Sequence, residues 1–269
     1  MDEARLQQLW DEIWELLDAD QTEEAIARTL RALNHEGEEP ELRYLLGVGL
    51  LDAGEPGAAI PELELATAEL TDSGDAFAAL AWARFRTCRF DEASEAVEAA
   101  LVMEPDLADA HQLAGLLAER EGDEVRARRE FGTARRLDPE SYPKAFEMKE
   151  EDFLGVARGV IAELDDEIRE VLDDSAFFVQ PFPDEELLVD SDPPLDPQLL
   201  GLFVGRSLLE RSVADSGAMP NTLYLFQNNL QRSATTRDEL EDEIRITVLH
   251  EIGHHLGWDE DDLEERGLE

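Results

Sequence analysis

The stretch CRFDEASEAVEAAL, residues 88–101, decides the architecture of the first half of the chain, because its pattern recurs at a fixed distance. Stretches of the same kind begin at Asp20, Gly54 and Gly122, so each start lies 34 residues after the last. Aligned in this way, small residues form three columns: Ala25, Ala59, Ala93 and Ala127; Ala32, Ala66, Ala100 and Ala134; and Gly47, Ala81 and Gly115. Small side chains at fixed places let paired helices approach closely, so the pattern predicts a stack of helical repeats.

These columns resemble the tetratricopeptide repeat, a helix-turn-helix unit of 34 residues, over roughly residues 4 to 140. Pro105 and Pro139 close the last two units, as expected where a missing N–H stops a helix. We expect an all-α superhelical array of about four repeats in a first domain at residues 1–144. Pro61 lies inside the second helix of the second unit and is expected to kink or shorten that helix.

In this family the first helices of the repeats line a groove that commonly binds a segment of a protein partner. By the family pattern, the groove positions are aromatic here: Trp10, Trp14, Tyr44, Trp82 and Phe85. The positions nearer the rim are Gln7, Glu41, Asp75 and Asp109. This composition favours a basic or apolar peptide segment as the partner. The alternative is that the aromatic side chains pack between helices or against the other domain.

The chain carries 66 acidic and 23 basic residues among 269, which gives a formal net charge of -43. This charge argues against nucleic acid or an anionic membrane as the partner, because both would be repelled. A solvated acidic coat, as in a salt-adapted protein, is the plainest interpretation. Cys88 is the only cysteine, which excludes an internal disulfide, and the opening MDEARLQQLW lacks the features of a signal peptide. We therefore expect a cytoplasmic protein.

The second half of the chain changes from helical repeats to a mixture of helix and strand. Apolar residues recur at spacings of three and four over residues 153–171, which predicts a helix. Three short apolar runs follow, SAFFVQPF (175–182), LLGLFVGRSL (199–208) and NTLYLFQNNL (221–230), and they predict strands. Residues 181–197 hold five prolines in seventeen residues, so this stretch is expected to be a loop.

The stretch LHEIGHHLGW, residues 249–258, closes an amphipathic helix and carries groups suited to metal chemistry. Thr236 followed by Glu239 fits a capping box, which places the start of this helix. His250 and His254 are one turn apart, so both imidazoles can reach one metal ion. Glu251 lies on a neighbouring face, where it could accept a proton from water bound to that ion without being a ligand. The spacing predicts a zinc site.

Residues 150–269 resemble the small bacterial zincin-like metallopeptidases through the blocks LLGLFVG, TLYLFQNNL and TVLHEIGHHLGWDEDDLEERGL. The resemblance implies a small α+β domain at residues 150–269, with a sheet against the motif helix. It also implies Zn²⁺ as cofactor, Glu251 as general base, and His250 and His254 as ligands together with a later acid. The compact motif places this third ligand at Glu260, with Asp259 as the alternative.

The implied activity is that of a zinc-dependent metallopeptidase, in which zinc-bound water attacks a peptide carbonyl and the repeats recruit a protein partner or substrate. An extended substrate would pair with an edge strand, most simply residues 223–227. Tyr224 and His255 are candidate donors to the oxyanion, although core packing and a position near the helix end explain them as well. The alternative function is a non-catalytic protein-interaction adaptor with a metal-stabilised zincin-like domain.

Overall fold

The computed structural model describes residues 3–37, 39–164, 166, 169, 172, 175–205, 221–256 and 258. The chain divides into two compact units. Unit 1 comprises Met1–Tyr142 and Val189–Asp196, and unit 2 comprises Pro143–Leu188 and Pro197–Glu269. None of the described helices is both long enough and apolar enough to cross a membrane. The segment Val189–Asp196 thus belongs to unit 1, although it follows part of unit 2 in the sequence.

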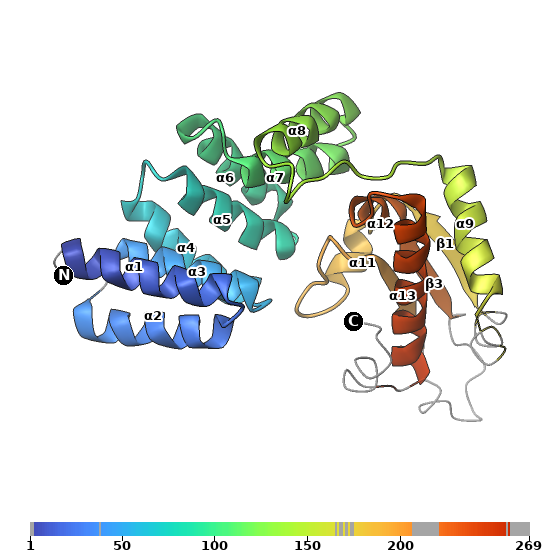
Figure 1. Cartoon of the computed structure of the whole chain (residues 1–269), viewed down its shortest axis with the longest axis horizontal. Coiled ribbons are helices and arrows are strands. Elements are labelled where there is room, and N and C mark those ends of the chain that lie inside the picture. Colours follow the sequence, from blue (N-terminus) through green and yellow to red (C-terminus); the bar gives the residue numbers. More distant parts are fainter. Residues whose placement is uncertain are drawn as a thin grey trace. The chain divides into compact units, whose positions relative to one another are not determined.

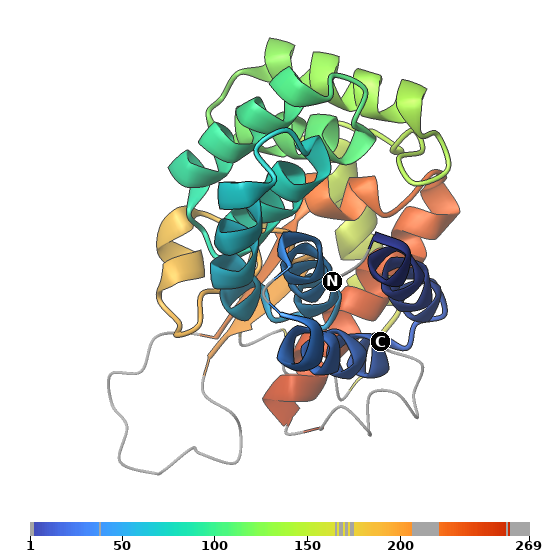
Figure 2. The same cartoon turned by 90° about the vertical axis from the view of Figure 1, so that its left-hand side faces the viewer.

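The described part of unit 1 is built from helices that follow one another as helix-turn-helix pairs (Figures 1 and 2). The pairs are α1 (Glu3–Asp18) with α2 (Thr22–Glu36), α3 (Pro40–Asp52) with α4 (Pro56–Glu69), α5 (Gly74–Arg86) with α6 (Phe90–Met103), and α7 (Ala108–Arg120) with α8 (Glu124–Leu137). The structure therefore confirms the all-α superhelical repeat architecture that the sequence predicts.

The turn inside each helix pair contains one residue in the left-handed region of backbone space. These residues are Asp20, Gly54, Cys88 and Gly122, with φ angles of 58°, 74°, 60° and 78°. In the third pair the N–H of Arg89 donates to the carbonyl of Arg84 at 2.8 Å, which closes the helix end as in a Schellman motif. The turn of each repeat therefore keeps the same left-handed backbone conformation. Cys88 has this structural role in the third repeat.

The small-residue columns lie where paired helices approach closely. A Cβ atom added to Gly47 would lie 2.4 Å from Cγ of Leu63, and one added to Gly115 would lie 2.5 Å from the ring of Phe131. The two columns of alanine are buried. Larger side chains at these places would push the helices apart, which explains why the columns recur with the repeat.

Pro61 does not shorten its helix. Helix α4 has 14 residues, as do α6 and α8. The expected shortening was therefore wrong. Pro61 is exposed, so water can reach the carbonyl that loses its donor at this point of the helix.

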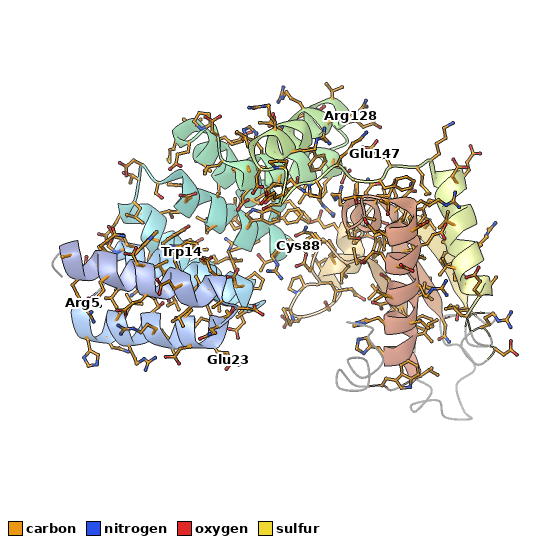
Figure 3. All side chains as sticks on the ribbon, in the orientation of Figure 1. Arg5, Trp14, Glu23, Cys88, Arg128 and Glu147 are labelled. Atoms are coloured by element: carbon orange, nitrogen blue, oxygen red, sulfur yellow. The ribbon has the colours of Figure 1, made fainter. Side chains whose placement is uncertain are left out.

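The end of helix α5 and the turn after it hold the segment Val189–Asp196 within unit 1. Nε of Arg86 donates to Oδ2 of Asp196 at 2.7 Å, and Nη1 of the same residue donates to the carbonyl of Leu51 at 2.9 Å. Sγ of Cys88, labelled in Figure 3, donates to the carbonyl of Leu195 at 3.5 Å. The segment Val189–Asp196 is therefore held to the repeats by an ion pair with Arg86 and by a hydrogen bond from the thiol of Cys88.

Unit 2 contains a sheet of three described strands in the order β1-β3-β2. The strands are β1 (Ala176–Gln180), which is parallel to β3 (Thr222–Phe226), and β2 (Gly201–Val204), which is antiparallel to β3. The helices are α9 (Glu150–Ala162), α11 (Glu185–Val189), α12 (Gln227–Arg232) and α13 (Arg237–Leu256). Helices α9 and α13 pack on one face of the sheet, where Leu223 and Leu225 share a buried cluster with Phe153, Ile244 and Val248 (Figure 1). This confirms the small α+β architecture.

Two elements differ from the sequence-based prediction. The helix expected over residues 153–171 begins earlier, at Glu150, and α9 ends at Ala162; most of the residues from 165 to 174 lie outside the described part. The proline-rich stretch expected to be a loop contains the short helix α11. Its prolines flank the helix, and the carbonyl of Asp184 accepts from the N–H groups of Leu187 and Leu188, so nothing interrupts the helical bonds there.

Candidate metal centre

The start of helix α13 is fixed by a capping box. Oγ1 of Thr236 accepts from the N–H of Glu239 at 3.2 Å, and Oε2 of Glu239 accepts from the N–H of Thr236 at 3.2 Å. The same carboxylate also accepts from the N–H of Thr235 at 2.7 Å. These reciprocal bonds satisfy donors that a helix start leaves open. The cap fixes where α13 begins, and the buried apolar side chains of α13 fix which face of the helix packs on the sheet. Together they determine the face on which the motif residues lie.

The two motif histidines converge at their ring nitrogens. Nε2 of His250 lies 3.0 Å from Nε2 of His254, and the rings are nearly perpendicular, with centroids 4.5 Å apart. Two imidazole nitrogens bound to one tetrahedral zinc ion, each at ~2.0–2.1 Å, stand about 3.3 Å apart. The observed separation differs from this value by only a few tenths of an ångström. The histidine pair therefore fits a shared zinc ion.

Glu251 points from the same helix toward strand β2. Its Oε2 accepts from the backbone N–H of Phe203 at 2.9 Å. Burial raises the pKa of the Glu251 carboxyl, whereas the hydrogen bond from Phe203 and the neighbouring His250 and His254 oppose that rise. A carboxylate with a raised pKa is a stronger proton acceptor than an ordinary glutamate. Glu251 is thus a buried carboxylate whose position is fixed by the backbone of β2.

Strand β2 reaches helix α13 closely because it begins with a glycine. A Cβ atom on Gly201 would lie 2.6 Å from Cγ2 of Thr247 and 3.1 Å from the carbonyl oxygen of Tyr224. Gly201 is therefore required for the approach that brings Phe203 to Glu251. The only signal of this role in the sequence is a glycine inside an apolar strand, which often marks a close backbone approach.

Asn229 holds the chain just before β2. Its Nδ2 donates to the carbonyls of Pro197 at 3.1 Å and Leu199 at 2.7 Å, and its Oδ1 accepts from Nη2 of Arg232 at 2.6 Å. The Asn229 side chain is buried, and these bonds use both its donor and its acceptor groups. The role of Asn229 could not be predicted from the sequence either, because its partners lie about 30 residues earlier in the chain.

Comparison with known protein families agrees with both halves of the structure. Residues 172–268 match the family described as zincin-like metallopeptidase, and residues 50–119 match the tetratricopeptide repeat. The chain joins a tetratricopeptide-repeat region to a zincin-like metallopeptidase domain. No curated protein matches the chain.

Several solved structures are similar to the chain over about half of its length. YrrB, described as a tetratricopeptide-repeat protein with an unusual peptide-binding site, is 22% identical, with 49% of this chain and 68% of that chain covered and a TM-score of 0.42. TTC0263, a tetratricopeptide-repeat protein from Thermus thermophilus, is 19% identical, with 49% and 74% covered and a TM-score of 0.45. MamA is 25% identical, with 53% and 79% covered and a TM-score of 0.42.

The third metal ligand of the predicted site is not among the residues that the structure describes. Glu260 and Asp259 both lie outside the described residues, as does the side chain of His255. Within the described residues, no group of three or more His, Cys, Asp or Glu side chains could hold a metal ion. The described part therefore supplies two nitrogen ligands and a neighbouring carboxylate, and the choice between Glu260 and Asp259 stays a prediction.

Two expectations about the sheet of the zincin-like domain were wrong. Strand β3, which contains residues 222–226, is paired on both sides, so it has no free edge for a substrate. Tyr224 stacks between Phe178 and Phe226, at centroid distances of 5.7 and 6.4 Å. Because side chains alternate along a strand and Leu223 and Leu225 face α13, Tyr224 points to the opposite face of the sheet. It cannot donate to an oxyanion at the histidine pair.

The aromatic positions predicted for the repeat groove separate into two clusters. Trp10 stacks on Tyr44 at 5.6 Å and lies 6.1 Å from Trp14, which Figure 3 labels. Phe85 is only 2% exposed and makes edge contacts with Trp82 and Phe90. Phe85 therefore belongs to the core between the helices and cannot contact a partner, whereas Trp10, Trp14 and Trp82 are partly exposed.

Proposed function

We propose that the protein is a zinc-dependent metallopeptidase in which His250, His254 and Glu260 hold the ion and Glu251 is the general base. The observation that carries this proposal is the 3.0 Å separation of the two Nε2 atoms beside a carboxylate that is not part of the pair. A structural zinc site would not need such a carboxylate. Zinc in this position would lower the pKa of a bound water molecule and polarise a peptide carbonyl.

The residues of the chain itself have distinct tasks in this reaction. Glu251 accepts the proton of the attacking water and passes it to the leaving amine. The N–H of Phe203 orients the Glu251 carboxylate, and its hydrogen bond keeps that group beside the histidines. An extended substrate would pair with an edge strand, and β2 is the better candidate because, among the described strands, it lies at an edge of the sheet and contacts Glu251.

The repeats, within a domain that we place at residues 1–144, would recruit a protein partner or substrate to the peptidase domain at residues 150–269. The partly exposed aromatic residues Trp10, Trp14 and Trp82 support binding of a basic or apolar segment. The single cysteine supports a reducing, cytoplasmic location for this activity.

The test compares the parent chain with Glu251→Gln, both loaded with one equivalent of zinc. A pool of internally quenched peptides reports cleavage of any sequence, and elemental analysis reports the bound zinc. We expect cleavage by the parent, loss of at least about a hundredfold in rate in the variant, and equal zinc in both. Equal zinc without cleavage by either protein would favour the adaptor function, and absence of zinc from both would reject the metal centre.

A further inference from the structure

The last helix of the repeats, α8, is basic although the chain as a whole is strongly acidic. The whole chain has 66 acidic and 23 basic residues, whereas α8 has five arginines and two glutamates in 14 residues. The side chain of Arg128, which Figure 3 labels, is 75% exposed. Arg135 is also exposed, and it forms no ion pair with any residue that the structure describes. The acids of the chain therefore neutralise the charge of α8 only in part.

The 34-residue register shows what Arg128 and Arg135 replace. The residues at the place of Arg128 in the earlier repeats are Ile26, Ile60 and Ser94, and those at the place of Arg135 are Leu33, Thr67 and Leu101. All six are buried or partly buried. Ile26 contacts the next repeat, because a Cβ atom added to Gly49 of α3 would lie 3.0 Å from its Cγ1. Arg128 and Arg135 thus form an end flank, the surface of α8 that a following repeat would cover.

The first helix, α1, carries acids on the opposite end of the repeats. Asp11 and Glu15 are exposed. In the later repeats the place of Asp11 is taken by Leu45, Ala79 and Leu113, and the place of Glu15 by Gly49, Ala83 and Leu117. These six residues are all buried or partly buried. Asp11 and Glu15 thus form a start flank, the surface of α1 that a preceding repeat would cover.

Hydration of the terminal repeats explains only part of this pattern. The outer flanks of a repeat array must be polar, because no neighbour covers them. In a chain with 66 acids and 23 bases, acidic residues would serve this purpose at both ends. The end flank instead has the charge opposite to that of the start flank. The two flanks are therefore complementary to each other as well as polar.

The contact between Ile26 and Gly49 predicts which charges would meet if the two flanks stacked. Arg128 has the place of Ile26 and Glu15 has the place of Gly49, so Arg128 of one copy would lie beside Glu15 of another. Consecutive helices of the repeats run in opposite directions, so Arg135 would then lie toward Asp11.

The net charge of -43 makes two copies repel each other as a whole, so association requires opposite charges in direct contact. At about 0.15 M salt, charges separated by more than ~8 Å are largely screened, whereas ion pairs in contact are screened much less. These conditions favour local pairing of the two flanks over the repulsion between the distant acids.

We propose that the repeats of one copy stack head-to-tail on the repeats of a second copy, with the end flank of one against the start flank of the other. Such a contact uses two different surfaces, so each assembly keeps one unused flank at either end and further copies can add. This inference does not depend on zinc or on peptidase activity. It gives the protein assemblies that carry more than one zincin-like domain.

The experiment measures the average mass of the full chain by sedimentation velocity at increasing protein concentration, at about 0.15 M salt. For the parent we expect the mass to rise from the 30.2 kDa of one chain to at least twice that value. Arg128→Glu with Arg135→Glu should stay monomeric, because both flanks are then acidic. Asp11→Arg with Glu15→Arg should also stay monomeric, because both flanks are then basic. An equal mixture of these two double variants should assemble again, since each supplies the flank that the other lacks.

The matched control is Arg31→Glu with Arg136→Glu, which changes the net charge as much as the end-flank variant does, at two exposed positions outside the flanks. This variant should assemble as the parent does. A parent that is monomeric at every concentration would overturn the inference. Equal loss of assembly in the control would do so as well, because repulsion by total charge would then be the cause. Failure of the mixed variants to assemble, with each still helical by circular dichroism, would exclude the pairing of these flanks.

Discussion

Nε2 of His250 and Nε2 of His254 lie 3.0 Å apart on the last turns of helix α13. At this distance the two ring nitrogens can share a hydrogen or bind one metal ion. The spacing of about one helical turn places both side chains on the same face of the helix, which permits this convergence.

Replacement of His254 by alanine should remove zinc from the protein. A single imidazole and one acid do not provide the three protein ligands of a zincin site. Elemental analysis after purification without added metal should give close to one zinc per parent chain and close to none for His254→Ala. His35→Ala, which removes a histidine from α2 in unit 1, should keep the parent content. Retention of parent levels by His254→Ala would contradict the assignment of this ligand.

Gly201→Ala should destabilise the zincin-like domain. The added methyl group would lie 2.6 Å from Cγ2 of Thr247, and overpacking of this kind costs roughly 1–3 kcal/mol. Urea unfolding followed by circular dichroism measures the change in the free energy of unfolding. Gly201→Ala combined with Thr247→Ser, which removes the opposing methyl group, should recover part of the loss.

The control for this prediction is Gly159→Ala in α9, where an added Cβ meets no atom within 4 Å. This variant should be as stable as the parent or more stable by up to about 1 kcal/mol, since alanine favours helix. If Gly201→Ala and Gly159→Ala had the same effect, close packing between β2 and α13 would not be the cause.

Glu130 should make part of the stability depend on pH. Burial raises the pKa of its carboxyl, but hydrogen bonds from Arg129 and His111, both at 2.7 Å, outweigh burial and lower the pKa overall. A carboxyl whose pKa is lowered by folding stabilises the protein above its unfolded pKa of about 4.3, and this stabilisation is lost as the pH falls through the folded pKa.

Glu130→Gln should therefore show a smaller loss of stability on acidification below about pH 4.3 than the parent. Urea unfolding at a series of pH values gives the two slopes. Glu124→Gln, which removes an exposed charge from the same helix, should keep the parent slope. Identical slopes for the parent and Glu130→Gln would show that the hydrogen bonds to Glu130 do not contribute to stability.

The contact between Arg86 and Asp196 should protect the segment Val189–Asp196 from proteolysis. The pair is partly buried at 2.7 Å, and its loss should allow local opening several times more often. Limited proteolysis of Asp196→Asn should show faster cleavage in this segment than the parent does. Asp190→Asn, which changes an exposed acid of the same segment, should be cleaved at the parent rate. Cleavage of both variants at equal rates would exclude a role for the ion pair.

The repeat architecture could be predicted because its constraints are local and periodic. The positions of Gly47 and Gly115 are fixed by contacts with the next helix of the same pair, so the sequence alone shows them as a column. The left-handed conformation of the turns was harder to predict from the sequence. Asp20, Gly54 and Cys88 share this backbone conformation but have no side-chain chemistry in common. A common backbone conformation leaves no signal when different residues can adopt it.

The histidine pair of the candidate site could also be predicted, since helical spacing places both side chains on one face of the helix. The contributions of the sheet to the candidate site could not be predicted from the sequence. The order β1-β3-β2 places the last described strand in the centre, and nothing local to residues 222–226 indicates pairing on both sides. The contact of Phe203 with Glu251 spans 48 residues, so it depends on that strand order. For the same reason Gly201 and Asn229 were recognised only from the fold.

The segment Val189–Asp196 has a consequence for how the protein could be divided. The chain passes between the two units at residues 142–143, 188–189 and 196–197, so neither unit is one continuous stretch of sequence. A break after Tyr142 would release the repeats without Asp196, the partner of Arg86. A break after Asp196 would keep that partner but would carry away α9 and β1 and leave β2 and β3 behind. No single cut yields two intact halves, and a zincin-like half grafted onto another protein would take with it a segment, Val189–Asp196, that belongs to the repeat unit.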